Sequence, residues 1–92
     1  MEFVVMYRLT EGVDRSRIFE TFPRHKAYYE AFQADGGGLI ALGPFQASDP
    51  AGASMGIFTS REDAERFIAG DPFTTEGLAD ARILEWDVVR FK

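Results

Sequence analysis

The chain of 92 residues has no cysteine, a single histidine (His25) and no cluster of lysine or arginine. Without cysteine, disulfide bonds and thiol catalysis are excluded, and one histidine alone makes a metal site unexpected. The net charge of −5 lacks the positive surface that nucleic-acid binding requires. The apolar run at residues 3–9 is short and has no basic residue before it. Neither a signal peptide nor a membrane span is therefore expected, which makes the cytoplasm the default location.

Apolar and aromatic side chains, by contrast, are abundant. Hydrophobic residues make up 46% of the chain, and nine residues are phenylalanine. A chain of this length is expected to form one domain, residues 1–92, with a core of its own. Nine phenylalanines are many for such a small domain to bury, which indicates that the protein forms an oligomer.

Hydrophobic periodicity predicts the element order β-α-β-β-α-β. Asp14 and Ser60 are suitable N-caps for the two helices, and Gly36 is a suitable stop for the first. Pro23 either kinks the first helix or begins its main segment. The expected strands are residues 2–10, 39–45, 53–59 and 81–91, and the expected helices are residues 15–34 and 61–69, with a turn at 48–52 and a short helical turn at 72–78.

This order is typical of an α+β, ferredoxin-like fold, in which two helices cover one face of a four-stranded antiparallel sheet. Gly43-Pro44 places the second strand at an edge or a bulge. The first strand is apolar on both sides, because Val4 and Met6 point one way and Phe3, Val5, Tyr7 and Leu9 the other. The second sheet face must also be hidden, which predicts a homodimer with the two sheets face to face, as an α+β barrel.

His25 is the feature most suggestive of chemistry. It lies at helical spacing from Ile18, Phe22, Tyr29 and Phe32, so the imidazole is expected on an apolar helix face. Histidine titrates near neutral pH, which makes a half-buried imidazole a plausible proton shuttle. The alternative is that His25 only packs and makes one hydrogen bond.

A catalytic His25 needs a carboxylate that orients its ring. The candidates are Asp35, Asp49 and Asp71, of which Asp71 is the most suggestive, although a helix cap alone would explain it. If the first and third strands run parallel, Asp71 lies at the far end of its helix from the start of the first helix. His25 must then lie well along that first helix for the two side chains to meet.

Other candidate residues have two readings each. Ser54 either donates a hydrogen bond to a substrate oxygen or is only a strand residue, and Tyr28 is either a pocket donor or a surface residue. Gly43 and Pro44 either shape a pocket wall or terminate a strand. The glycine run at residues 36–38 closes a helix and opens a strand, which excludes a phosphate-binding loop.

Several segments resemble the YCII-related (YciI-like) family, over nearly the whole chain. They are residues 24–28 (RHKAY), 42–45 (LGPF), 54–57 (SMGI), 69–73 (AGDPF) and 77–78 (GL), with Trp86 in the final strand. The resemblance implies a dimeric α+β barrel with a pocket that holds a His-Asp pair, here His25 and Asp71. Some relatives act on small aromatic or lactone-like substrates, and one reaction is metal-free removal of chloride from a chlorinated hydroxyquinol.

Three hypotheses follow. The first is a cofactor-independent lyase or isomerase acting on a small organic or aromatic acid, with His25 and Asp71 as catalytic residues and Ser54, Tyr28, Gly43, Pro44 and Phe73 as substrate-binding residues. The second is a non-catalytic small-molecule binding or sensing module, in which no carboxylate pairs with His25. The third is a structural subunit without a pocket. A cofactor-free monooxygenase of the same barrel superfamily fits less well.

Overall fold

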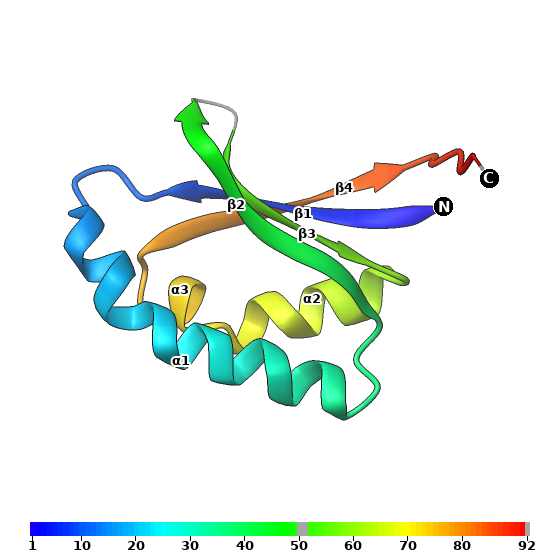
Figure 1. Cartoon of the computed structure of the whole chain (residues 1–92), viewed down its shortest axis with the longest axis horizontal. Helices are drawn as coiled ribbons and strands as arrows, with labels where there is room; N and C mark the ends of the chain where they lie inside the picture. The colour runs from blue at the N-terminus through cyan, green and yellow to red at the C-terminus, as the bar shows by residue number, and fades with distance from the viewer. Residues whose placement is uncertain (50–51, 92) are drawn as a thin grey trace.

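The computed structural model describes residues 1–49 and 52–91. In this part of the chain, four strands form one antiparallel sheet in the order β2-β3-β1-β4, with the helices on one of its faces (Figure 1). The predicted α+β ferredoxin-like fold is confirmed. The elements are β1 (Glu2–Leu9), α1 (Arg15–Ala34), β2 (Leu39–Asp49), β3 (Gly52–Phe58), α2 (Arg61–Gly70), α3 (Pro72–Thr75) and β4 (Ala79–Trp86).

Helix α1 is continuous and carries the predicted caps. The Asp14 carboxylate accepts a hydrogen bond from the Ser16 amide at 2.9 Å, which satisfies one free donor of the first turn. The helix passes through Pro23 and closes at Asp35, and Gly36 follows with a φ of 74°, a conformation that glycine adopts without strain. Of the described helices, none combines the length and the hydrophobicity needed to cross a membrane.

Strand β2 is longer than predicted, because it continues to Asp49 instead of ending at Phe45. Its expected position at an edge is correct, and Pro44 is tolerated there because one side of an edge strand needs no ladder hydrogen bonds. The register shifts beyond Pro44, as expected for a bulge. The turn predicted at residues 48–52 falls largely on residues 50 and 51, which lie outside the described residues.

Strand β4 is displaced from its predicted range of 81–91. It begins at Ala79 and ends at Trp86, which pairs with Glu2 at the start of β1. Beyond Trp86 no residue of β1 remains as a partner, so Val89 and Phe91 do not extend the sheet and are strongly exposed. The predicted continuation of this strand to residue 91 was therefore wrong.

The core lies between the sheet and the helices. Val5 and Tyr7 of β1 pack there with Phe58 of β3, and Ala64 and Phe67 of α2 cover them. Tyr28, Tyr29 and Phe32 of α1 add partly buried rings. The alternation of β1 therefore turns Val5 and Tyr7 toward the helices, which places the phenol of Tyr7 beneath α1 and α3.

The helices leave the opposite sheet face uncovered (Figure 1), and the centre of this face is apolar, with Arg82 opposite Met6 and Glu2 opposite Trp86. Val4 lies there between its strand partners Ile57 and Leu84, since residues directly opposite one another share a face. Leu84 and Trp86 are each 40% exposed. We refer to the face formed by Val4, Met6, Met55, Ile57, Leu84 and Trp86 as the open face.

Candidate functional site

The relative direction of the helices brings the candidate residues together. The layout that took the first and third strands as parallel was wrong, because β1 and β3 pair antiparallel, with Val5 opposite Gly56. Helices α1 and α2 therefore run in opposite directions, and the first half of α1 lies beside α3 and the end of α2 (Figure 1). His25, near the middle of α1, reaches Asp71 without any shift of the helix.

Asp71 occupies the junction between α2 and α3. Its amide donates to the carbonyl of Phe67 at 3.0 Å, which closes α2, and its Oδ1 accepts from the amide of Phe73 at 3.1 Å, which caps α3. Asp71 is a helix cap, as one reading of the sequence proposed. The cap uses only part of the carboxylate, which leaves both oxygens able to accept further hydrogen bonds.

Two side chains use this remaining capacity. The His25 Nδ1 lies 2.8 Å from Asp71 Oδ1, and the Tyr7 hydroxyl donates to Asp71 Oδ2 at 2.9 Å. His25 is 8% exposed and Asp71 is fully buried. We call this arrangement the Tyr–Asp–His chain (Tyr7, Asp71 and His25). The distance that a His-Asp pair requires is met directly, without a bridging water.

Tyr7 was not identified from the sequence as a site residue. In the pattern of β1 it is one of several large apolar residues on the core face, and its partner Asp71 lies 64 residues away. One signal was available: a tyrosine at a buried strand position needs a partner for its hydroxyl group. The sequence does not say which group that partner is.

Aromatic rings hold the imidazole in place. Phe73 stacks on it with the ring centroids 4.2 Å apart and the planes 15° from parallel, while Tyr29 meets it edge-on at 5.2 Å. In the described part of the chain, the one fully buried side-chain oxygen or nitrogen without a partner is Thr10 Oγ1. The Nε2 of His25 bonds no described residue, and the His25 side chain keeps 10% of its surface exposed.

Tyr28 is engaged with the main chain. Its hydroxyl donates to the carbonyl of Phe67 at 3.0 Å, and the carbonyl of Arg66 lies at 3.2 Å. Burial raises the pKa of the Tyr28 phenol, and the nearby Asp71 carboxylate adds to this effect. This hydroxyl binds the last turn of α2, which differs from the predicted role as a donor to a ligand.

The other candidates for substrate binding lie in two places. Phe73 belongs to the ring stack on His25, and Ser54 lies opposite Tyr7 in the β1–β3 ladder, on the sheet face that the helices cover. Gly43 and Pro44 instead line a shallow hollow of about 210 Å³ on β2 and β3, to which none of the three residues of the Tyr–Asp–His chain contributes. The structure therefore separates Gly43 and Pro44 from the immediate surroundings of His25.

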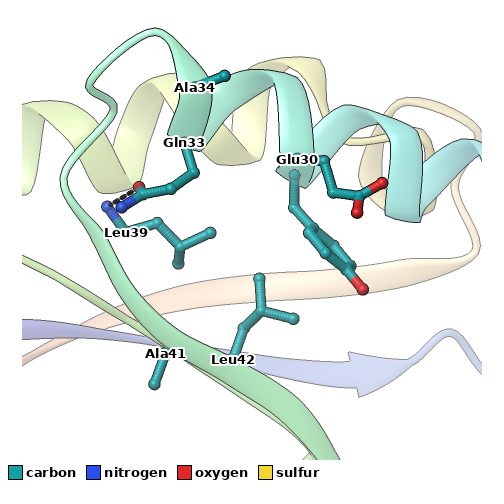
Figure 2. Close-up of a pocket in the computed structure, with 7 residues that line it drawn as sticks. Glu30, Gln33, Ala34, Leu39, Ala41 and Leu42 are labelled. Carbon is teal, nitrogen blue, oxygen red and sulfur yellow. Dashed lines mark hydrogen bonds between the residues drawn. The ribbon is translucent and has the colours of Figure 1, made fainter.

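A larger hollow of about 440 Å³ lies between α1 and β2 (Figure 2). Leu42 points into it from β2, and Glu30 and Gln33 project from α1 above it (Figure 2). Gln33 is partly committed, because its Oε1 accepts from the amide of Leu39 at 2.9 Å. Tyr29 also lines this hollow and touches His25, so the hollow and the imidazole are neighbours along α1.

The buried phenol of Tyr7 predicts a loss of stability in alkali. Burial raises its pKa far above the usual value of 10, and the adjacent Asp71 carboxylate adds to this rise. The unfolded chain therefore loses this proton first, and the free energy of unfolding should fall above pH 10 by up to about 1.4 kcal/mol per pH unit. Urea unfolding at pH 9, 10 and 11 should show a smaller decrease for Tyr7→Phe than for the wild type. Equal decreases would contradict the assignment.

The fold and the site together define an α+β ferredoxin-like domain with an ionisable cluster in its core. The model of the YCII-related domain family matches residues 1–87, and the chain belongs to this family. The suggested resemblance is thereby confirmed. A search of the curated proteins finds no match to the sequence.

Two solved structures share the fold. One is the 5-chloro-2-hydroxyhydroquinone dehydrochlorinase TftG from Burkholderia phenoliruptrix AC1100, in complex with 2,5-dihydroxybenzoquinone, with a TM-score of 0.70 and 23% identity over 95% of this chain and 94% of that one. The other is SnoaB, a cofactor-independent oxygenase from Streptomyces nogalater, with a TM-score of 0.59 and 14% identity over 96% and 95% of the two chains.

Proposed function

We propose that the protein is a cofactor-independent enzyme that carries out acid–base chemistry on a small organic or aromatic molecule. The observation that carries this proposal is the 2.8 Å contact between His25 Nδ1 and a fully buried Asp71, combined with an Nε2 that bonds no described residue. The competing binding module requires a histidine without a paired carboxylate. The pairing therefore favours an enzyme.

His25 and Asp71 together can act as a general base. Asp71 orients the ring and stabilises the imidazolium that forms when Nε2 takes a proton from a ligand. The same proton can then return to another atom, as in a lyase or isomerase reaction. A positioned base of this kind contributes roughly 10²–10⁴-fold to a rate.

The surroundings favour a flat, largely apolar ligand. Phe73 and Tyr29 present rings around the imidazole, and Tyr29 also lines the hollow between α1 and β2. Ser54, next to Tyr7 in the sheet, is the candidate donor to an oxygen of the ligand. The two neighbours in fold are consistent with this class, because one was solved with a dihydroxybenzoquinone and the other is a cofactor-independent oxygenase.

The proposed assembly is a homodimer through the open face. Val4, Ile57 and Leu84 form its centre, and Trp86 extends it along β4. Burying apolar surface contributes roughly 25 cal/mol per Å², and a monomer with this face in water would tend to aggregate. A second copy presents the same apolar face and covers it symmetrically.

The test of the proposed function is a titration with 2,5-dihydroxybenzoquinone as probe. Calorimetry in two buffers of different ionisation enthalpy measures affinity and the number of protons exchanged. For His25→Ala, we expect the affinity to fall at least about tenfold and the proton exchange to disappear, since a hydrogen bond to a charged group is lost. Lys26→Ala, a change of an exposed neighbour on the same helix, should behave as the wild type. A wild type that does not bind, or a His25→Ala variant that binds equally, contradicts the proposal.

A further inference from the structure

Three described groups bond the Asp71 carboxylate: the Tyr7 hydroxyl, the Phe73 amide and the His25 ring. Tyr7 donates to Oδ2, while the amide of Phe73 and the ring of His25 are bonded to Oδ1. Among the described residues, no lysine or arginine forms an ion pair with Asp71. A carboxylate buried this completely stays ionised only if hydrogen bonds compensate the lost hydration.

Of the three groups that bond the Asp71 carboxylate, only the Tyr7 hydroxyl binds Oδ2. We infer that Tyr7 is a positioning residue for His25: its hydroxyl keeps Asp71 in the accepting form, which holds the imidazole hydrogen on Nδ1 and leaves the lone pair on Nε2. This inference rests on the proposed function for its catalytic meaning, but the hydrogen-bond arrangement exists without a ligand.

The consequence for His25 follows from the donor and acceptor roles of the pair. If Asp71 takes a proton, it donates to Nδ1, and the hydrogen of a neutral ring then sits on Nε2. A ring in that form cannot accept a proton from a ligand. Tyr7 opposes protonation of Asp71. Burial and the Asp71 carboxylate raise the pKa of the Tyr7 phenol, so its hydroxyl keeps its hydrogen and continues to donate it to Asp71.

Other titratable groups around the pair are differently engaged. Tyr28 donates to a carbonyl of α2, and Tyr29 contacts the imidazole through the edge of its ring. Arg24, next to His25 on α1, pairs with Glu76 just after α3 and lowers the pKa of that carboxyl group. Among the described side chains, these contacts leave Tyr7 as the one besides His25 that bonds the Asp71 carboxylate.

The test uses the single histidine as a probe. In protein labelled with ¹⁵N-histidine, the two ring nitrogen shifts report which nitrogen carries hydrogen when the ring is neutral. We expect the Nδ1–H form to predominate in the wild type. In Tyr7→Phe, the ratio of Nδ1–H to Nε2–H should fall by roughly three- to tenfold, the equivalent of one hydrogen bond. Tyr28→Phe removes a partly buried hydroxyl that bonds α2 and not Asp71, so its ratio should equal that of the wild type.

A folded Tyr7→Phe variant with an unchanged ratio would overturn the inference. If this variant does not fold, the ¹³C shift of the Asp71 carboxyl in the wild type decides instead: an ionised carboxylate at neutral pH supports the inference, and a protonated one overturns it. Neither measurement involves a ligand. Failure of the probe titration alone would therefore reject the proposed function, whereas an unchanged ratio alone would reject the role of Tyr7.

Discussion

Replacing Asp71 by alanine should lower the free energy of unfolding by about 3–5 kcal/mol, although the change removes only a few atoms. The Tyr7 hydroxyl, the His25 ring and the Phe73 amide would lose their common acceptor inside the core. A buried donor without a partner costs about 1–3 kcal/mol, and the loss of a helix cap about 1 kcal/mol. Since a small domain has only about 5–15 kcal/mol in total, this single change should bring the protein close to unfolding.

Asp14→Ala is the matched control for this prediction. Asp14 also caps a helix, through a 2.9 Å bond from the Ser16 amide, but its carboxylate is exposed and binds nothing from the core. Its loss should cost only about 1 kcal/mol. Urea unfolding of both variants measures the difference directly. Similar losses would show that the buried hydrogen bonds of Asp71 contribute little to stability.

Leu84→Glu should convert the proposed dimer to a monomer. Leu84 lies opposite Val4 on the open face and is 40% exposed in the single chain, so a glutamate there can remain solvated in the monomer. In the dimer, the same carboxylate would be buried against apolar side chains without a partner, which costs several kcal/mol. Light scattering coupled to size exclusion should give the wild type twice the chain mass of 10.3 kDa and the variant the chain mass.

Phe19→Glu provides the comparison for this prediction. Phe19 is an apolar residue of α1 that is 73% exposed, on the helical side of the sheet and away from the open face. The substitution introduces the same charge but should leave the dimer intact. A wild type that is monomeric at micromolar concentration, or a Phe19→Glu variant that dissociates as readily as Leu84→Glu, would show that the open face is not the interface.

Local signals in the sequence were sufficient to predict the order of helices and strands, but not the residue at which each of them ends. The caps at Asp14 and Ser60 and the stop at Gly36 are short-range features, and all three lie where they were expected. The end of β4 depends instead on pairing, because the strand stops where β1 has no further residue to offer. The sequence of residues 88–91 (VVRF) contains no information about the missing partner strand.

The candidate site was predictable to a similar extent. His25 and Asp71 could be singled out because each belongs to a recognisable local pattern, a helical stripe and a capping segment. Their contact required the directions of the helices, which depend on β1 and β3 being antiparallel. Tyr7 has no such local pattern, and its role became visible only when the strand was placed beneath α3. Tyr28 was predicted to be either a pocket donor or a surface residue, and its hydroxyl is bound to α2 in the structure.

The Tyr–Asp–His chain also has a consequence for the order of folding. Its contacts join residues that are 46 and 64 positions apart, on three segments that no local element brings together. Contacts of such long range form late, since the entropy of closing the intervening loops must first be overcome. A folding intermediate with formed helices would therefore lack the oriented imidazole, and acid–base activity should appear only with the final closure of the core.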